Sequence, residues 1–332
     1  MVLPTMDGLS VAGLKQTLAV FVYLFALLVV GPASLGLLVY SLLWTDHYWV
    51  SLLYGLWWLL DVQTCNRGGR QSAWVPWVRS WSIWRHLRDY FPIRLIKTSE
   101  LNPRHNYILC CHPHGIICFG SVTCFASEAE NFSAKFPGIF PHVNTIEGNL
   151  WMPGFREFFL MFGAVSSSKE SLTHLLSTRG GGKAAVLMVG GIPEMENFQE
   201  NSVRVVLNRR KGFIKLALRH GTHLVPTFVF GETHLYKQSG LFSSCQDWIR
   251  SVIGISPVLF YGRGFFQNSF GFLPYKKRMY VVVGSPIRVD RIPEPSQEDI
   301  DNLHSVYVRS VRKLFNKYNP IYGDKKSNLV IE

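Results

Sequence analysis

Apolar and polar positions divide the chain into an N-terminal block without charge and a longer body of mixed pattern. Thr17 to Trp44 is an uncharged run of 28 residues, longer than the roughly 20 that a helix needs to cross a bilayer. A second uncharged run, His47 to Leu60, has 14 residues and is too short to cross alone. We expect either one tilted span with an interfacial segment, or a hairpin that enters the membrane and returns.

Charge next to this block indicates its orientation. No acidic residue lies between Asp61 and Asp89, whereas this interval carries Arg67, Arg70, Arg79, Arg85 and Arg88. Because Lys and Arg accumulate on the cytosolic side of membrane segments, the body is expected in the cytosol. A cleaved signal peptide is the alternative, but the block is too long and lacks a clean small-residue cleavage site.

Tryptophans recur at helical spacing directly after the arginines begin, at Trp74, Trp77, Trp81 and Trp84. Three- and four-residue intervals predict one amphipathic helix. It either lies in the membrane interface or packs on the core of the body.

The body alternates short apolar runs with helical patterns. Five runs are predicted as buried strands: Tyr107–Cys111, Ala184–Val189, Leu224–Phe230, Val258–Tyr261 and Tyr280–Val283. Helices are predicted over Arg210–His220 and Glu298–Tyr318. This alternation predicts an α/β fold, a mainly parallel sheet with flanking helices. We divide the chain into a cytosolic N-terminus (1–16), a membrane-embedded hairpin or span (17–60), an interfacial segment (61–100) and a catalytic domain (101–332).

Composition supports a membrane setting and limits the partners. Charged residues make up 17% of the chain, against about 25% in a typical soluble domain. The net charge of +12 favours anionic partners. The apolar content argues against a nucleic-acid module, so phospholipid headgroups or a phosphate-bearing substrate are expected instead. Six sparse cysteines without a C-x-x-C pair indicate reduced thiols.

The sharpest candidate for chemistry is His112-Pro113-His114-Gly115, directly after a predicted strand. The carboxyl ends of strands are where α/β folds present functional groups. Imidazole titrates near neutral pH, so two histidines on such a turn suit general-base catalysis.

Two other chemistries compete for the same segment. Cys110, Cys111 and Cys118 with the histidines form a possible zinc set, but successive strand residues face opposite ways. A cysteine nucleophile beside His112 is the other alternative, and nothing marks a depressed thiol pKa. We expect no metal.

Two further motifs carry charge. Gly190-Gly191-Ile192-Pro193-Glu194 follows a predicted strand, and Glu194 can orient an imidazole or a hydroxyl, or be a solvated side chain of a turn. Arg209, Arg210, Lys211 and Gly212 open a predicted helix. Cations at a helix N-terminus suit the phosphates of coenzyme A, and contact with lipid headgroups explains them equally well.

The ordered set of motifs resembles the type 2 diacylglycerol acyltransferase family, which includes monoacylglycerol and wax-alcohol acyltransferases. Matching blocks run from about Asp61 to Lys317. They include Arg67-Gly68-Gly69-Arg70, Tyr90-Phe91-Pro92, His112-Pro113-His114-Gly115, Gly190-Gly191 with Glu194, Arg210-Lys211-Gly212-Phe213, Phe230-Gly231-Glu232 and Gly262-Arg263-Gly264.

The resemblance implies a glycerolipid acyltransferase-like fold and transfer of an acyl group from acyl-CoA to a lipid alcohol. Diacylglycerol is the first candidate acceptor, and monoacylglycerol or a long-chain alcohol are the others. It also implies a multi-pass protein of the endoplasmic reticulum membrane with a cytosolic body, association with lipid droplets, and acyl-CoA as co-substrate without a bound cofactor. A homo-oligomer is compatible with it, and nucleic acid is not an expected partner.

We assign the general base to His112 and a supporting or oxyanion role to His114. No aspartate follows either histidine at the spacing of the H-x-x-x-x-D motif found in other glycerolipid acyltransferases. Glu194 and then Glu128 are therefore the candidates for the supporting carboxylate. The alternative function is a lipid-binding scaffold of the same fold that has lost catalysis.

Overall fold

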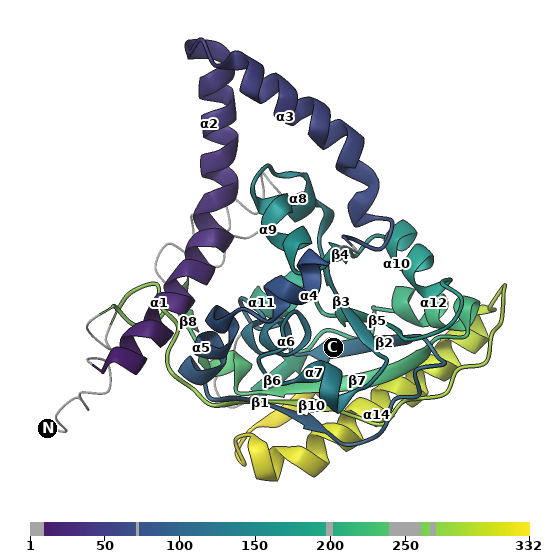
Figure 1. The fold of residues 1–332 in the computed structure, drawn as a ribbon. Helices are drawn as coiled ribbons and strands as arrows, with labels where there is room; N and C mark the ends of the chain where they lie inside the picture. The colour runs from purple at the N-terminus through teal and green to yellow at the C-terminus, as the bar shows by residue number, and fades with distance from the viewer. Residues whose placement is uncertain (1–9, 71–72, 197–201, 239–259, 266–269) are drawn as a thin grey trace, which may run out of the picture.

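The computed structural model describes residues 10–70, 73–196, 202–238, 260–265 and 270–332. Within these ranges the centre is a seven-stranded sheet in the order β1-β10-β7-β2-β5-β3-β4 (Figure 1). Its strands are β1 Ile93–Lys97, β10 Met279–Val283, β7 His223–Phe230, β2 Tyr107–His112, β5 Lys183–Met188, β3 Phe140–Thr145 and β4 Val165–Ser166.

Most neighbouring strands of this sheet are parallel. β7, β2, β5, β3 and β4 run in one direction, whereas β10 is antiparallel to β7 and parallel to β1. A mainly parallel sheet with flanking helices confirms the expected fold class. The antiparallel β10 pairing was not anticipated.

The sheet separates two apolar cores. In β2, Leu109 and Cys111 face one core while Ile108 and Cys110 face the other, as alternation along a strand requires. The first core is covered by α5 (Ser82–Tyr90), α6 (Phe119–Phe125) and α9 (Phe155–Met161), and the second by α10 (Lys169–Leu176), α12 (Gly212–His220) and α14 (Gln297–Tyr322). The remaining elements of the body are η3 Val62–Cys65, α4 Trp74–Arg79, α7 Phe132–Lys135, α8 Glu147–Trp151, α11 Ile192–Glu196, β6 Ser202–Val205, η4 Glu232–His234, β8 Lys237–Gln238, β9 Phe260–Tyr261 and β11 Asn328–Ile331.

The expected C-terminal helix is confirmed and has a clear start signal. Ser296 accepts a hydrogen bond from the Asp299 N–H at 3.1 Å, and the Asp299 carboxylate accepts one from the Ser296 N–H at 2.8 Å. This reciprocal pair is a capping box, which satisfies free N–H groups at a helix start.

Two expected elements differ in the structure. The tryptophan-rich stretch forms two helices, α4 and α5, because the backbone of Trp81 is extended. Trp74 and Trp77 are exposed, whereas Trp84 is buried and donates to the Val78 carbonyl at 2.9 Å. The stretch therefore has both an outward aromatic end and a core-packed end.

The strand expected at Val258–Tyr261 is described only at Phe260 and Tyr261. These two residues form β9, which pairs with β8 in a separate two-stranded ribbon and not with the main sheet.

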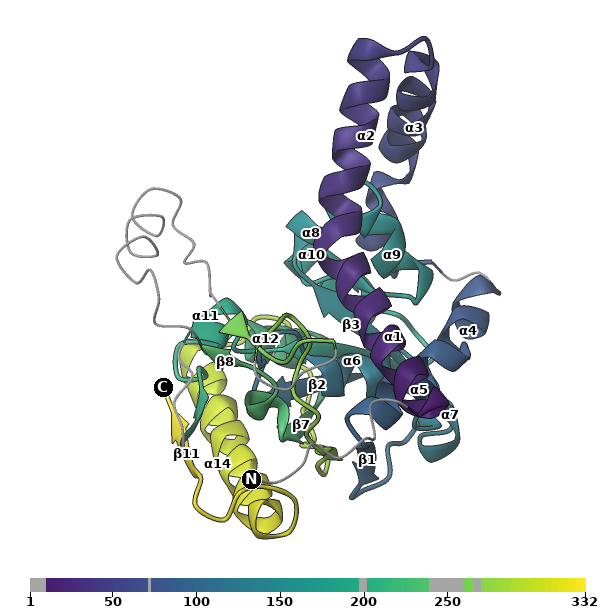
Figure 2. The ribbon, with the colours of Figure 1, turned by 90° about the vertical axis from the view of Figure 1, so that its left-hand side faces the viewer.

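The N-terminal block forms a helical hairpin that projects from the body (Figures 1 and 2). α1 (Val11–Phe25), η2 (Ala26–Val30) and α2 (Gly31–Trp44) make one continuous helix, and α3 (Tyr48–Asp61) returns toward the body. Of the helices in the described ranges, Val11–Trp44 alone is long and apolar enough to cross a membrane, with mean hydropathy 2.4 over its best window. The first part of this helix packs against the body, since Val20 and Tyr23 belong to the first core.

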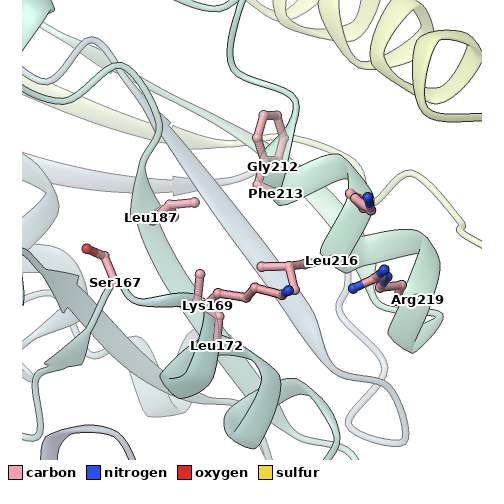
Figure 3. Close-up of a pocket in the computed structure, with 9 residues that line it drawn as sticks. Ser167, Lys169, Leu172, Leu187, Gly212, Phe213, Leu216 and Arg219 are labelled. Carbon is pink, nitrogen blue, oxygen red and sulfur yellow. The ribbon is translucent and has the colours of Figure 1, made fainter. Parts of the chain in front are cut away.

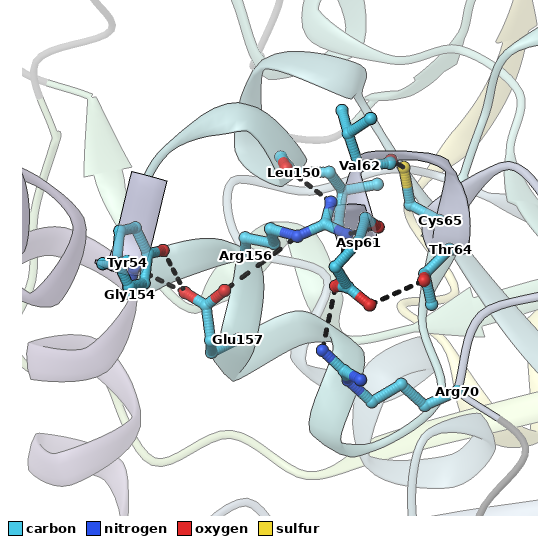
Figure 4. Close-up of polar contacts among 10 residues, drawn as sticks. All are labelled: Tyr54, Asp61, Val62, Thr64, Cys65, Arg70, Leu150, Gly154, Arg156 and Glu157. Carbon is cyan, nitrogen blue, oxygen red and sulfur yellow. Dashed lines mark hydrogen bonds and ion pairs between the residues drawn. The ribbon is translucent and has the colours of Figure 1, made fainter. Parts of the chain in front are cut away.

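A buried arginine fastens the returning end of the hairpin to the body (Figure 4). Arg156 of α9 is fully buried, and its Nη2 contacts both the backbone carbonyl of Asp61 and the Asp61 carboxylate, the latter at 2.7 Å. Arg70 reaches the same carboxylate at 2.9 Å. Tyr54, in the middle of α3, donates to Glu157 at 3.0 Å. These polar contacts tie α3 to α9 at the base of the hairpin.

Candidate active site

Three neighbouring parallel strands bring the candidate groups to one edge of the sheet. His112 is the last residue of β2, Glu194 follows β5, and Glu232 follows β7. Because the carboxyl ends of parallel strands meet at the same edge, these side chains converge there with His114. His112, His114 and Glu194 were expected from the sequence, and Glu232 was not singled out.

His112 is buried within this edge. Its side chain has no exposed surface, and its Nε2 lies 2.8 Å from the hydroxyl of Tyr307 in α14. Its Nδ1 has no hydrogen-bond partner among the residues that the structure describes. Burial lowers the pKa of His112 to about 3, so the ring is neutral at physiological pH. Within the described ranges, its one polar side-chain contact thus comes from α14.

His114 lies further out on the turn and is half-buried. Its Nδ1 is 2.8 Å from the carbonyl oxygen of Gly115. A carbonyl only accepts, so Nδ1 carries the ring proton and Nε2 keeps a lone pair. Burial lowers the pKa of this imidazole, which favours the neutral form. A neutral ring with an unprotonated Nε2 is the state that a general base requires.

Glu194 holds the backbone of the histidine turn. One carboxylate oxygen accepts the His114 N–H at 2.7 Å, and the other accepts the Val206 N–H at 2.8 Å. Burial raises the pKa of Glu194 to about 7, against the opposing effects of these hydrogen bonds and of the Arg210 charge. Glu194 therefore positions the main chain of His114 rather than contacting an imidazole.

Glu232 holds the other end of the same turn. Its two oxygens accept the N–H groups of Phe119 and Gly120, each at 2.8 Å. Burial raises its pKa to about 7. A Cβ atom at Gly115 would lie 2.5 Å from the Cγ of Glu232, so the carboxylate packs directly against the glycine of the motif. The sequence signal was available, because Gly231-Glu232 directly follows an apolar run, as Glu194 follows Gly190-Gly191.

Glu128 lies in a different environment. It accepts hydrogen bonds from the Ser133 N–H at 3.1 Å and hydroxyl at 2.9 Å, and it lies 3.9 Å from Arg79. The described contacts connect Glu128 to neither histidine.

Cys118 is next to the histidine turn as a neutral thiol. Its Sγ lies 3.6 Å from Nε2 of His114 and donates to the His114 carbonyl at 3.0 Å. Burial raises its pKa well above the usual value, which disfavours the thiolate needed for nucleophilic attack. Among the described residues, no group of three or more His, Cys, Asp or Glu is placed to hold a metal ion.

The basic run before α12 is largely engaged by the protein. Lys211 pairs with Asp301 at 2.6 Å, and Arg210 donates to the Gly190 carbonyl at 3.2 Å. Arg209 is exposed, and Gly212 is the first residue of α12. Arg210 thereby supports the loop that carries Glu194.

The arrangement has features that suit general-base chemistry. The structure presents a neutral imidazole whose Nε2 lies 3.6 Å from the Cys118 thiol, on a turn held by two buried carboxyl groups. The chain also carries an apolar hairpin suited to a lipid phase. Comparison of the sequence supplies the family. The chain belongs to the diacylglycerol acyltransferase family, whose model matches residues 40–332.

Two relatives with 38% and 41% sequence identity agree with this assignment. Diacylglycerol O-acyltransferase 2 of Danio rerio is 41% identical over 322 residues, covering 95% of this chain and 88% of its own. Acyl-CoA wax alcohol acyltransferase 2 of Homo sapiens is 38% identical over 328 residues, covering 97% of each chain. A solved 1-acyl-sn-glycerophosphate acyltransferase of Thermotoga maritima matches with TM-score 0.41 and 11% identity, over 91% of this chain and 96% of that one.

Proposed function

We propose that this protein is an acyl-CoA-dependent O-acyltransferase that esterifies a lipid alcohol, with diacylglycerol as the first candidate acceptor. The observation that carries the proposal is His114, a neutral imidazole whose Nδ1 is engaged by the Gly115 carbonyl and whose Nε2 is left to accept a proton. Similarity to both diacylglycerol and wax-alcohol acyltransferases supports an acceptor with a free hydroxyl. Monoacylglycerol and long-chain alcohols are the other acceptors to test.

The reaction proceeds by direct transfer. Nε2 of His114 takes the proton of the acceptor hydroxyl as its oxygen attacks the thioester carbonyl of acyl-CoA. The new C–O bond forms, the C–S bond breaks, and the proton passes from the imidazolium to the departing CoA thiolate. A thiolate is a good leaving group, so no covalent enzyme intermediate is required.

His112 acts in this mechanism by positioning. The sequence alone favoured His112 as the base, but its Nε2 is occupied by Tyr307 and its ring is fully buried. A buried, neutral imidazole tied to α14 fixes the end of β2, from which His114 extends. The two histidines thus have different roles, which separate substitutions can distinguish.

The length of the hairpin suits a protein whose body stays on one side of the membrane. α2 and α3 have 14 residues each, or about 21 Å of helix at 1.5 Å per residue. The hydrocarbon core is about 30 Å thick. Because both ends of the hairpin return to the body, we propose that it enters the cytosolic face of the endoplasmic reticulum membrane. The same geometry is compatible with the monolayer of a lipid droplet.

The base of the hairpin adds apolar contacts to this surface. α8 lies at the base in both views (Figures 1 and 2), and it carries the exposed side chains Ile146, just before the helix, and Trp151 at its end. Tryptophan is enriched where membrane meets water. We propose that α8 contacts the interface where the lipid alcohol enters.

A microsomal assay tests the activity. Labelled acyl-CoA is offered with diacylglycerol, monoacylglycerol or hexadecanol, and ester products are separated and counted. His114→Ala should lower turnover by about 10²–10⁴-fold, as expected for loss of a general base. His105→Ala, at the exposed opposite end of β2, is the matched control and should retain activity.

Two outcomes would contradict the proposal. Full turnover by His114→Ala removes this histidine from the base role. No ester with any of the three acceptors, from folded wild-type protein, would favour a lipid-binding scaffold of the same fold.

A further inference from the structure

A cavity of about 350 Å³ lies between α10, α12 and the end of β5 (Figure 3). Its lining combines four apolar side chains with three cations and two small residues: Leu172, Leu187, Phe213 and Leu216; Lys169, Lys215 and Arg219; Ser167 and Gly212. This volume is at the lower end of the 300–1,000 Å³ range typical of small-molecule sites. It can hold a phosphate-bearing moiety but not an entire acyl-CoA.

Three cationic side chains give the lining of this cavity its positive charge. Within the part of the chain that the structure describes, none of Lys169, Lys215 and Arg219 has a carboxylate at ion-pair distance. The Nε of Arg219 is buried and has no hydrogen-bond partner in the described part of the chain. Lys211, one helical turn before Lys215, is by contrast paired with Asp301. Three unpaired cations around one concavity attract an anion.

Two helix starts add to this potential. α10 begins at Lys169, and α12 begins at Gly212, and both residues line the cavity. The N-terminus of a helix carries partial positive charge and unpaired N–H groups. Apart from its chain neighbours and the backbone of its own helix, no atom of the described residues lies within 4 Å of a Cβ built at Gly212, so the approach to the first turn of α12 is open. Glu170, the acidic residue in the first turn of α10, does not line the cavity.

The cavity is connected to the histidine turn by two contacts. Phe213 lines the cavity and packs edge-on against Tyr307, with ring centroids 5.1 Å apart. Tyr307 in turn lies 2.8 Å from Nε2 of His112. Leu187, near the carboxyl end of β5, belongs to the same side of the sheet. An acyl-CoA bound with its phosphates in the cavity would extend its thioester along this edge toward His114.

We infer that this cavity binds the phosphate groups of acyl-CoA through Lys169, Lys215 and Arg219. The inference rests on the proposed transferase function and deepens it, because it moves the expected CoA contacts from Arg209, Arg210 and Lys211 to a different set of cations. The headgroup of an anionic phospholipid carries the same phosphate chemistry, so the experiment must separate the two sources.

The test is equilibrium binding to the purified full-length protein in detergent. The probe is a labelled, non-hydrolysable thioether analogue of palmitoyl-CoA. The double variant Lys169→Gln, Lys215→Gln should raise its Kd by about tenfold or more, since it removes two positive charges from the lining of the cavity, and tenfold corresponds to about 1.4 kcal/mol. The matched control is Lys313→Gln, Lys317→Gln, two lysines of α14 beside a different cavity, for which Kd should stay within about twofold.

A second probe identifies the phosphates as the cause. The palmitoyl-pantetheine thioether lacks the nucleotide and pyrophosphate, so wild type and the double variant should bind it equally. An unchanged Kd for the CoA analogue in the Lys169→Gln, Lys215→Gln protein would overturn the inference. So would a variant that loses only binding to vesicles with phosphatidic acid, because that result assigns the cavity to lipid headgroups.

Measurements of binding and of turnover distinguish failure of the phosphate site from failure of the transferase proposal. If wild type forms no ester but the double variant still weakens binding of the CoA analogue, the transferase proposal fails and the phosphate site stands. If both proteins form ester with the same KM for acyl-CoA, the transferase proposal stands and the cavity is not the phosphate site. Arg219→Lys, which keeps the charge, should bind the analogue more tightly than Arg219→Gln.

Discussion

Replacing Arg156 with methionine removes the guanidinium that joins the hairpin to the body. Arg156 is among the largest side chains that the described structure buries completely. It donates to the Asp61 carboxylate at 2.7 Å, to the Asp61 backbone carbonyl, and to the Leu150 carbonyl at 3.1 Å. Methionine fills much of the same space without satisfying any of these oxygens.

The expected loss of folding free energy follows from the buried oxygens that lose Arg156 as their hydrogen-bond donor. Removing one partner of a buried ion pair costs about 3–5 kcal/mol. Asp61 keeps its contacts to Arg70 at 2.9 Å and Thr64 at 2.7 Å, which places the cost near the lower end. A loss of about 3 kcal/mol lowers the melting temperature by roughly 4 °C, because an unfolding entropy of about 2.1 cal/mol/K per residue amounts to about 0.7 kcal/mol/K for a chain of 332 residues.

Thermal unfolding in detergent, followed by tryptophan fluorescence, measures the effect. Limited trypsin digestion adds a local measurement, because release of the end of α3 should loosen the backbone around Arg67, whose side chain is already exposed, and speed cleavage there. Arg85→Met is the control, an exposed arginine of α5 whose replacement should change stability by less than about 0.5 kcal/mol. If Arg156→Met melts within 1 °C of Arg85→Met, with no faster cleavage, the polar anchor does not hold the hairpin.

Three further outcomes are expected. Burial raises the Glu194 pKa from 4.5 to about 7, so folding favours the protonated carboxyl and its stabilising contribution is lost as pH rises from 4.5 to about 7. Glu194→Gln should therefore reduce the slope of melting temperature against pH in this interval without abolishing it, because burial also raises the Glu232 pKa to about 7; an unchanged slope would contradict the assignment. Tyr307→Phe leaves Nε2 of buried His112 without a partner, which should cost about 1–3 kcal/mol of stability in a denaturant titration. Trp151→Ser should weaken flotation with liposomes, while Ile321→Ser, an equally exposed apolar position on α14 away from the hairpin (Figure 1), should not.

Strong local patterns made the centre of the fold predictable. The apolar runs that became β2, β5, β7 and β10 are nearly continuous, as strands buried on both faces require. β3 was missed because Phe140–Thr145 contains a proline, a histidine and an asparagine. The direction of β10 was also missed, since an apolar run carries no information on whether its neighbour is parallel.

The site was predictable only where a residue follows a strand. His112, His114 and Glu194 were found by this rule, and Glu232 satisfies it equally. Tyr307 lies 195 residues from His112 in the middle of a helix, where it resembles any core aromatic. The cations of the cavity come from two helices, α10 and α12, which the fold alone brings together. The clustered run Arg209–Lys211 was the more visible pattern and is mostly engaged by the protein.

The glycines around the two buried carboxyl groups restrict how this chain can diverge. A Cβ at Gly190 would overlap the carboxyl group of Glu194, and one at Gly120 would lie 2.8 Å from an oxygen of Glu232. A Cβ at Gly115 would lie 2.5 Å from the Cγ of the same glutamate. A larger residue at Gly190 requires a shorter side chain at Glu194, whereas at Gly120 the Cβ would also lie 2.7 Å from Val229, and Gly115 has a φ of +63° that disfavours any side chain. Each glutamate and its glycines should therefore change together between relatives, as linked substitutions and not as independent ones.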